Sequence, residues 1–227
     1  RATTRDRLPM SDRRLILGID TSCDETSAAV VADGSEILSN VVSSQMDVHE
    51  RFGGIVPELA SRRHTEVITR IIDRALTDAG VALGDVHAVA VTNRPGLIGA
   101  LLVGVEAAKA LAFTQGIPII PVHHIEGHVY ANSMVHDVPF PHLCLTVSGG
   151  HTMLVHVREG WEYELVGATL DDAVGEAYDK VAKLLGLGFP GGPIIDKLAH
   201  DNAEEPVEFT IPMARSSSYD FSFSGLK

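Results

Sequence analysis

The sequence is poor in cysteine and in basic residues, and it contains no long uninterrupted apolar run. Only two cysteines occur, Cys23 and Cys144, and each lies inside a motif, so reduced thiols are favoured over a disulfide. No run of 18 uncharged apolar residues is present, which argues against a membrane span. The opening residues lack the apolar segment of a secretory signal. These absences predict a cytoplasmic protein.

Acidic residues outnumber basic ones, 30 to 18, which gives a formal net charge of −12. Because binding to phosphate depends on Lys and Arg side chains, this balance argues against a broadly basic nucleic-acid surface. Local basic patches remain candidates at residues 62–64 and at three lysines. An ordinary solvated helix face is the simpler interpretation of each patch. The three lysines are Lys180, Lys183 and Lys197.

Two strand-turn-strand units occur far apart in the sequence and suggest a duplicated α/β domain with a cleft between its halves. The first has an apolar strand, Leu15–Asp20, a polar turn at 21–27 and a returning strand at 28–32. The second has strands at 143–147 and 152–157 around the turn 148–151. Between the two units we expect further strands and helices, which fit a mixed α/β fold. They are a strand at 35–44, an amphipathic helix at 57–80, a strand at 86–92, a helix at 97–113 buried on nearly all sides, and a strand at 117–122.

Histidines are concentrated between positions 123 and 156, where seven of the chain's eleven lie. His124 and His128 are four apart, so on a helix both imidazoles share one face and can reach one metal ion. A pair of surface or capping histidines is the alternative. Glu126 does not share their face, and Ile125 stands where the zinc-protease pattern requires Glu, which weakens a metalloprotease interpretation.

The second half contains further candidates for binding a nucleotide. Gly149 and Gly150 let the backbone approach a bound phosphate. A helix is predicted at 171–185, capped by Asp171 or Asp172, with Asp179 at the edge of its apolar face. The alternative role of Asp179 is an ion pair with Lys183. The turn 189–193 leads into another helix that carries Asp196.

Eight motifs follow one another in order: ILGIDTSCDETSAAVV, GGIVPELASRRH, PGLIGALLVG, VHHIEGH, VSGGHT, DDAVGEAYDKVAKLLGL, PGGP and DFSFSGLK. With these motifs, residues 15–227 resemble the tRNA N6-adenosine threonylcarbamoyltransferase family (TsaD in bacteria), once described as sialoglycoprotein endopeptidases. The resemblance implies the two-lobed α/β fold of the actin, Hsp70 and hexokinase (ASKHA) group. We therefore expect a tail at 1–12, predicted to be disordered, a first lobe at 13–122, a metal-ligand helix and linker at 123–138, and an incomplete second lobe at 139–227.

The resemblance also implies an activity, an acyl transfer in tRNA modification. Threonylcarbamoyl would pass from threonylcarbamoyl-AMP to the exocyclic amine of the adenosine 3′ of the anticodon in tRNAs reading ANN codons, with release of AMP. Expected partners are tRNA, a TsaB-like paralogue and a TsaE-like ATPase, or a second copy in a homodimer. Carried over by motif, the site residues fall into three groups. Iron or zinc would be bound by His124 and His128, the substrate by Val147, Ser148, Gly149, Gly150, His151, Asp179, Gly192 and Asp196, and the catalytic acids would be Asp24 and Glu25.

Two departures from the family pattern stand out. Arg94 occupies the place of a glycine, where it would change the local turn or add a basic contact for RNA. The chain ends at Lys227, inside a motif, so the resemblance implies that an Asn that contacts the nucleotide and an Asp that completes the metal site are missing, with weak metal retention and little activity. A metal-dependent glycoprotease and a nucleotide-binding scaffold of the Hsp70 or actin type are the alternative functions.

Overall fold

The computed structural model describes residues 12–202 and 207–227, so the predicted tail at 1–12 lies almost wholly outside the described residues. The chain divides into two compact units. The first runs up to Asp47 and again over Val56–Gly127, and the second comprises Val48–Ile55 and His128–Lys227. The division at the later boundary falls inside one helix, between Gly127 and His128.

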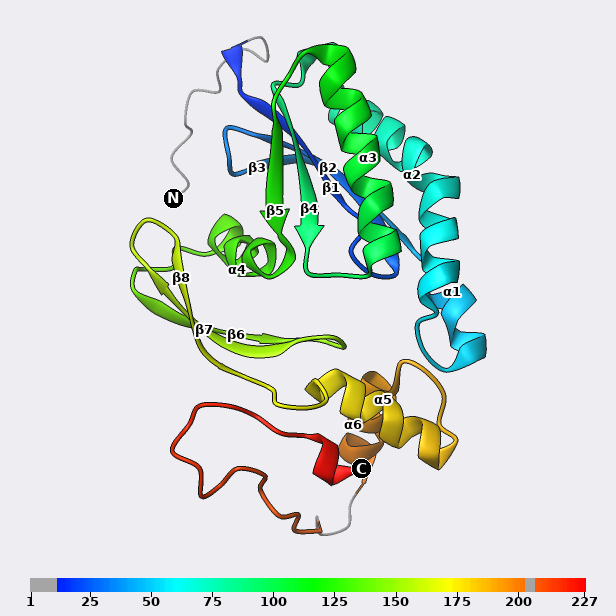
Figure 1. Cartoon of the computed structure of the whole chain (residues 1–227), viewed down its shortest axis with the longest axis vertical. Coiled ribbons are helices and arrows are strands. Elements are labelled where there is room, and N and C mark those ends of the chain that lie inside the picture. The colour runs from blue at the N-terminus through cyan, green and yellow to red at the C-terminus, as the bar shows by residue number, and fades with distance from the viewer. Residues whose placement is uncertain (1–11, 203–206) are drawn as a thin grey trace. The chain divides into compact units, whose positions relative to one another are not determined.

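A mixed sheet of five strands, in the order β3-β2-β1-β4-β5, forms the centre of the first unit (Figure 1). Strand β2 runs antiparallel to its neighbours β1 and β3, while β4 and β5 run parallel to β1. The predicted strand Leu15–Asp20 is confirmed as β1, and its burial alternates along the strand. The bounds are β1 (Leu15–Asp20), β2 (Glu25–Ala32), β3 (Glu36–Ser44), β4 (Ala88–Arg94) and β5 (Ile119–His123).

Two long helices, α2 (Pro57–Ala79) and α3 (Ile98–Gln115), lie side by side on one face of this sheet (Figure 1). Helix α2 begins at Pro57, whose missing N–H costs nothing in a first turn. It ends at Ala79 and is followed by Gly80, whose φ of 68° suits glycine. Short helical turns complete the unit's connections. They are α1 (Met46–His49), η2 (Glu50–Phe52) and η3 (Leu83–Asp85), with α1 and η2 crossing into the second unit's residues.

The core of the first unit lies between the sheet and these helices. Val67 is buried on α2 as the sequence indicates, but Ile71 and Leu76 are half-buried at its edge, and Ile72 takes the central position. The buried apolar residues of the cluster are Leu17, Ile19, Ala28, Val30, Ile68, Ile72, Ala75, Val86, Val89, Val91, Ala108 and Ala112.

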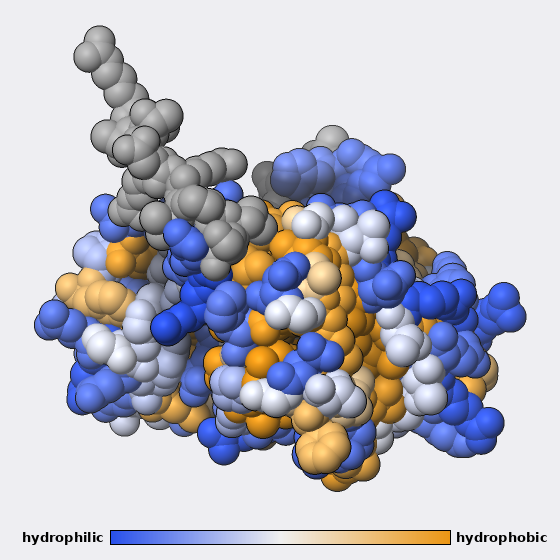
Figure 2. Space-filling model, turned by 90° about the horizontal axis from the view of Figure 1, so that it is seen from above, coloured by the Kyte–Doolittle hydropathy of each residue, from blue (hydrophilic) through white to orange (hydrophobic). Residues whose placement is uncertain are grey.

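The prediction that α3 is buried on nearly all sides is wrong. Its buried positions are the small residues of a single stripe, namely Ala100, Gly104, Ala108 and Ala112. Of its large apolar side chains, Val103, Val105 and Leu111 are half-buried against the core. Others are exposed: Ile98 is 79% exposed and Phe113 is 89% exposed. Apolar side chains that reach the surface are visible as orange areas in Figure 2. Apolar composition alone could not tell which face is buried, because small residues allow α3 to approach its neighbours closely.

Among the described residues, α3 is the one helix that is long and apolar enough to cross a membrane. A single such helix is weak evidence for a membrane span, because core helices of soluble proteins can have the same length and composition. Glu106 and Lys109 form an ion pair on its surface, and the helix packs on α2 and β4.

The second unit has an antiparallel sheet in the order β6-β7-β8. Helices α5 and α6 pack against each other. The ring of Trp161 contacts those of Tyr130 and Phe140, with centroids 4.7 Å and 5.1 Å apart. The bounds are α4 (His124–Val135), β6 (His142–Val147), β7 (Thr152–Arg158), β8 (Glu162–Ala168), α5 (Val174–Leu185), α6 (Gly191–Asp201) and η4 (Ser224–Leu226).

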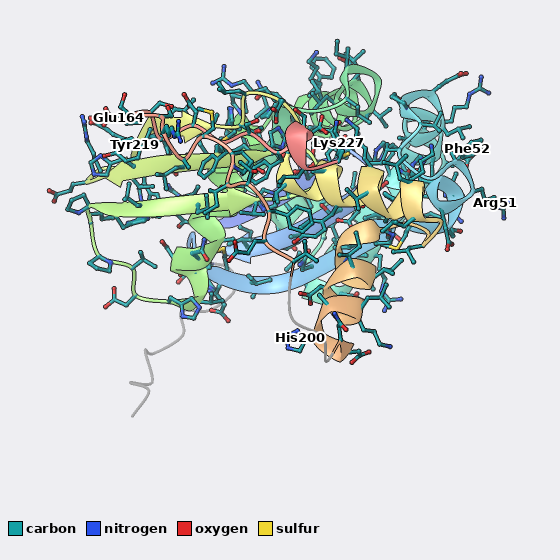
Figure 3. The ribbon with its side chains drawn as sticks, turned by 90° about the horizontal axis from the view of Figure 1, so that it is seen from below. Arg51, Phe52, Glu164, His200, Tyr219 and Lys227 are labelled. Atoms are coloured by element: carbon teal, nitrogen blue, oxygen red, sulfur yellow. The ribbon has the colours of Figure 1, made fainter. Side chains whose placement is uncertain are left out.

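The prediction that Asp171 or Asp172 caps helix α5 is wrong, because the N-cap residue is Ala173. The carboxylate of Asp171 accepts hydrogen bonds from the last residues of the chain, at 222–224. Asp172 forms ion pairs with Lys180 and Lys227, and Figure 3 labels Lys227 at this end of the chain. These two acids therefore fasten the C-terminal segment to the turn before α5.

Candidate functional site

The turn of the first hairpin, residues 21–24, is held by backbone and hydroxyl contacts to α3. The hydroxyl of Thr21 donates to the carbonyl of Ala100 at 2.8 Å and accepts from the N–H of Gly104 at 3.2 Å. The carbonyl of Ser22 accepts from the N–H of Leu97 at 2.8 Å. A side chain at Gly96 would place its Cβ 2.5 Å from that same carbonyl, so only glycine fits there.

The other side of the turn is held by a fully buried histidine of α2, His64. Its Nε2 lies 3.0 Å from the carbonyl of Cys23, and its Nδ1 lies 2.8 Å from the hydroxyl of Thr26. Because a carbonyl can only accept, Nε2 carries the proton and Nδ1 accepts from Thr26. The interpretation of residues 62–64 as a basic patch or solvated face is thus wrong for His64, while Arg62 and Arg63 lie on the surface in ion pairs with acids of their own helix.

Of the two predicted catalytic acids, Asp24 lies in the turn and is half-buried, and its carbonyl accepts from the N–H of Gln45. Glu25 is exposed and is the first residue of β2, so the strand begins earlier than the sequence indicates. Burial, together with the charge of Asp24, raises the pKa of the Cys23 thiol to about 12. Cys23 is therefore a protonated thiol at neutral pH and not a nucleophile.

A polar cluster at the end of β1 joins the first hairpin to the start of α4. Oδ2 of Asp20 lies 2.8 Å from the hydroxyl of Thr92 and 3.0 Å from Nδ1 of His124. Oδ1 accepts from the N–H of Ser22 at 2.7 Å, and the Ser22 hydroxyl lies 3.1 Å from the same His124 nitrogen. Burial alone would raise the pKa of Asp20, but the hydrogen bonds from His124 and Ser22 outweigh it and lower the pKa to about 2.

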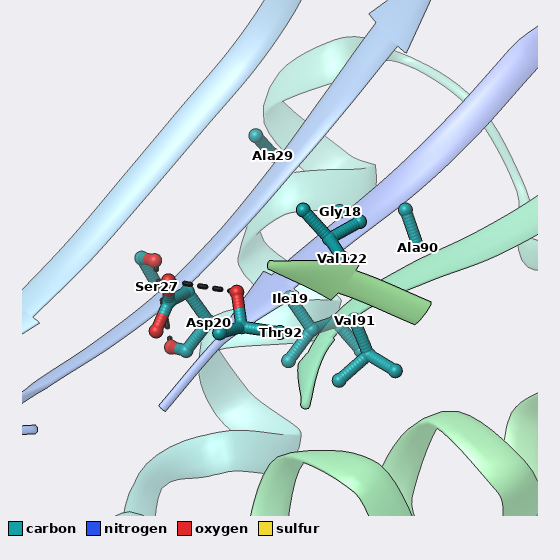
Figure 4. A pocket seen from close by; sticks show the side chains of 9 residues that line it. All are labelled: Gly18, Ile19, Asp20, Ser27, Ala29, Ala90, Val91, Thr92 and Val122. Atoms are coloured by element: carbon teal, nitrogen blue, oxygen red, sulfur yellow. Dashed lines mark hydrogen bonds between the residues drawn. The ribbon is translucent and has the colours of Figure 1, made fainter. Parts of the chain in front are cut away.

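A cavity of about 190 Å³ opens beside Asp20 and Thr92 on the face of the sheet (Figure 4). Asp20, Ser27 and Thr92 supply its polar edge, and apolar side chains of the strands supply the rest. Its lining consists of Gly18, Ile19, Asp20, Ser27, Ala29, Ala90, Val91, Thr92 and Val122.

Helix α4 carries both predicted metal ligands, with His124 as its first residue and His128 one turn later. His124 belongs to the first unit and is partly shielded, while His128 belongs to the second unit and is exposed. Imidazole nitrogens are suitable ligands for both iron and zinc. The Nδ1 of His124 also hydrogen-bonds to the carboxylate of Asp20, as the second nitrogen of many metal-binding histidines does. The two histidines fit such an ion as a partial set only, since no three His, Cys, Asp or Glu side chains of the described residues are gathered in a way that could hold an ion.

Arg94, the departure from the family pattern, is the exposed last residue of β4 and pairs with His123 of β5. That the side chain of Arg94 contacts RNA stays a prediction.

The turn of the second hairpin is closed by Ser148. Its N–H donates to the carbonyl of His151 at 2.8 Å, and its hydroxyl accepts from the N–H of His151 at 3.0 Å. Gly149 and Gly150 are exposed, and a Cβ at either would meet nothing within 4 Å, so one side of the turn is open. The first turn of α5 packs on the other side, where a Cβ at Gly175 would lie 2.7 Å from the Ser148 carbonyl.

Asp179 on α5 has a structural contact that the sequence did not indicate. Its Oδ1 accepts from the N–H of Gly191 at 2.7 Å and so fastens the start of α6. The alternative of an ion pair with Lys183 is not what is found. Gly192 lies in the first turn of α6 with open space on its Cα, and Asp196 is exposed one turn further on. The structure thus brings Asp179 and the 189–193 turn together.

The sequence reasoning missed the residues that support the candidate site, above all Asp20, Thr92 and His64. A signal existed for Asp20, because a carboxylate at the end of a buried strand is costly unless it has partners. For Thr92 and His64 no such signal existed. They contact the first hairpin from β4 and α2, and no sequence pattern links those elements to the hairpin turn.

Comparison with known proteins gives consistent matches. The model of the family described as TsaD, tRNA N6-adenosine threonylcarbamoyltransferase, matches residues 36–227. A protein of that name from Halalkalibacterium halodurans is 59% identical over 218 residues, which are 96% of this chain and 63% of the relative. One from Geobacillus kaustophilus is 60% identical over 220 residues, with 96% and 64% covered. The chain therefore spans slightly less than two thirds of the length of these relatives.

Among solved structures, component A of (R)-2-hydroxyglutaryl-CoA dehydratase from Acidaminococcus fermentans superposes with a TM-score of 0.50 at 18% identity. The match covers 88% of this chain and 62% of that one. At this identity the likeness concerns the fold alone. The prediction of an α/β fold is confirmed by the strands and helices of both units.

Proposed function

The chain belongs to the tRNA N6-adenosine threonylcarbamoyltransferase family, and from that membership we propose that it transfers threonylcarbamoyl from threonylcarbamoyl-AMP to tRNA. The acceptor is the exocyclic amine of the adenosine 3′ of the anticodon in tRNAs reading ANN codons, and AMP is the leaving group. The observation that carries the proposal is the extent of the family match, over residues 36–227, together with 59% identity to a relative of that name. A metal-dependent glycoprotease and an Hsp70- or actin-like scaffold are not favoured by these matches.

The acyl-adenylate is held by the second unit. The open turn at Val147–His151 offers the N–H groups of Gly149 and Gly150 to the phosphate, and the absence of side chains there lets the phosphate approach. Ser148 supports this role, because its two hydrogen bonds to His151 fix the turn before the ligand arrives.

The adenosine of threonylcarbamoyl-AMP is bound by Asp179, Gly192 and Asp196. Asp179 serves twice: Oδ1 fixes the N-terminus of α6, and its second oxygen accepts from a ribose hydroxyl. Gly192 leaves space for the nucleoside, and Asp196 supplies a further acceptor on the same helix.

His124 and His128 are the protein ligands of an iron or zinc ion. When bound, the ion supplies Lewis-acid polarisation near the acyl phosphate. Two protein ligands would leave coordination positions of the ion to other donors, such as solvent or substrate. His124 contributes through Nε2, since its Nδ1 faces Asp20.

Transfer requires that the adenosine nitrogen loses a proton as it bonds to the carbonyl carbon. The bond between that carbon and the phosphate oxygen then breaks, and AMP leaves with the electron pair. Asp24, half-buried in the turn of the first hairpin, accepts the proton, and Glu25 adds negative charge that favours its removal. The turn that holds Asp24 is fixed by its contacts to α2 and α3, so the carboxylate needs little reordering.

Because the chain carries a net charge of −12, it needs partners to provide part of the surface that binds tRNA. The proposed partners are a TsaB-like paralogue and a TsaE-like ATPase. In their absence, two copies of the chain are proposed to form a homodimer. A cytoplasmic location is part of the same proposal.

The test is a reconstituted transfer assay with threonylcarbamoyl-AMP, an unmodified tRNA that reads ANN codons and the two partner proteins. Modified adenosine is quantified by mass spectrometry of nucleosides, and AMP release is followed in parallel. Asp24→Asn should lower the rate by about 10²–10⁴-fold, as loss of a general base does, while Asp73→Asn on the exposed side of α2 should leave it unchanged. A wild-type rate for Asp24→Asn, with unchanged substrate binding, would remove Asp24 from the mechanism.

A further inference from the structure

Asp20 is surrounded by hydrogen-bond donors that come from three elements of the first unit. The N–H of Ser22, in the hairpin turn, donates to Oδ1. The hydroxyl of Thr92, near the end of β4, and Nδ1 of His124, at the start of α4, both point to Oδ2. The side chains of Asp20 and His124 are only 31% and 23% exposed, so the protein and not the solvent sets their geometry.

These contacts fix the direction of the hydrogen bond between the two side chains. An ionised carboxylate can only accept, so the proton of a neutral His124 lies on Nδ1. The lone pair of the imidazole is then on Nε2. The hydroxyl of Ser22, 3.1 Å from Nδ1, can accept from the same proton and so favours the same tautomer.

We propose that Asp20 is a positioning residue for His124, which holds the imidazole in the Nδ1-protonated tautomer so that Nε2 faces a metal ion. This inference rests on the proposed metal-binding role of His124. Carboxylates that accept from the second nitrogen of a ligating histidine fix its orientation and increase its basicity. Asp20 does not touch the metal or the substrate in this role.

Thr92 extends the arrangement by one step. Its hydroxyl is buried and donates to the same Oδ2 that accepts from His124. A hydroxyl that is fixed on a central strand stops the carboxylate from rotating away. Thr92→Val, which keeps the shape and removes the hydroxyl, should therefore weaken the positioning, whereas Thr92→Ser keeps the donor.

The first measurement is the tautomer of His124 in the metal-free protein. Nitrogen-15 NMR of protein labelled at histidine distinguishes protonated from unprotonated ring nitrogens, and the His124 signals are assigned by their loss in His124→Gln. The wild type should show a protonated Nδ1. Asp20→Asn should move the proton to Nε2, because its amide can donate to Nδ1 while its oxygen keeps the N–H of Ser22.

The second measurement is zinc affinity by competition with a chromophoric chelator at neutral pH, with His124→Gln as the baseline. Asp20→Asn should lower the affinity by about 10–100-fold, Thr92→Val by a smaller factor, and Thr92→Ser should match the wild type. Urea unfolding of each variant establishes that the fold is retained, and Thr92→Val gives the test if Asp20→Asn does not fold.

A wild-type His124 protonated on Nε2 would overturn the inference, and so would an Asp20→Asn variant with unchanged tautomer and unchanged zinc affinity. If the wild type binds zinc no better than His124→Gln, the metal-binding part of the proposed function fails instead. The tautomer measurement, which needs no metal, then still decides whether Asp20 positions His124.

Discussion

Gly104 in the middle of α3 offers a sharp test of how the first unit is packed. The stripe of small residues on α3 brings its backbone against the hairpin turn, where Thr21 bonds to both Ala100 and Gly104. A Cβ at position 104 would lie 2.4 Å from the Thr21 hydroxyl oxygen, closer than atoms can approach without movement. Gly104→Ala must therefore displace Thr21 or shift the helix.

The expected loss follows from three contributions. Overpacking costs about 1–3 kcal/mol, and loss of the two hydrogen bonds of Thr21 costs about 1 kcal/mol each. Alanine is the better helix former by about 1 kcal/mol, which offsets part of that cost. We expect Gly104→Ala to lower the free energy of unfolding by about 2–4 kcal/mol.

The assay is urea unfolding followed by circular dichroism, with Gly127→Ala as the matched control. Gly127 is also helical, but a Cβ there would meet nothing within 4 Å, so this change should be neutral or stabilising by up to about 1 kcal/mol. In a Thr21→Ala background the atom in conflict is gone, so Gly104→Ala should cost much less. An equal cost in both backgrounds would refute the reasoning, because the two sites would then be uncoupled.

Three further predictions concern buried or hydrogen-bonded groups. His64→Ala should lower the free energy of unfolding by about 2–4 kcal/mol in the same assay, because the carbonyl of Cys23 loses its donor and a cavity remains. Arg62→Ala, at an exposed position of the same helix, should change it by less than about 0.5 kcal/mol. Acid should release the C-terminal segment. Hydrogen bonds to the side chain of Asp171 hold its pKa well below 3.8, so their stabilisation is complete above that value and is lost as the pH falls through the lowered pKa. The amide protection factor of Phe223 should fall over that range, and Asp171→Asn should lower it already at neutral pH; an unchanged factor would contradict the contact. Cys23, with its pKa raised to about 12, should react with iodoacetamide at pH 8.5 far more slowly in the folded protein than in urea, as measured by peptide mass spectrometry.

Elements with strong local signals could be predicted from the sequence. The bounds of α2 follow from Pro57 at its start and Gly80 after its end, and both residues act through their own backbone preferences. The family, too, was identified correctly from motifs, because long runs of specific residues carry that information. The two hairpins were found because apolar strands flank a short turn of polar residues or glycines in each.

The contacts between elements could not be predicted in the same way. Helix α3 is rich in apolar residues all round, so only the structure reveals that Gly104 and its small neighbours form the buried side. For Asp179 the sequence offered an ion pair within its own helix as the alternative to substrate binding, but its hydrogen-bond partner is the backbone of Gly191 in the next helix. Asp171 fits a cap by sequence, yet a segment some fifty residues later takes its carboxylate. In each case a residue contacts a different element of the chain instead of its sequence neighbours. The sequence pattern around that residue does not indicate such a contact.

The turn of the first hairpin shows what these distant contacts achieve together. Leu97 donates to the carbonyl of Ser22, Gly104 donates to the hydroxyl of Thr21, and His64 donates to the carbonyl of Cys23. Three consecutive residues of the turn are thus fixed by α2 and by α3 with its N-cap residue. Ser22 in turn donates to Asp20, which faces His124. A change at Gly104 should therefore alter stability and zinc affinity together, because it moves the turn. Thr92→Val should alter zinc affinity with much less effect on stability, because it acts on the carboxylate alone. The separation of these two effects is what distinguishes a turn that supports the site from one that merely closes a hairpin.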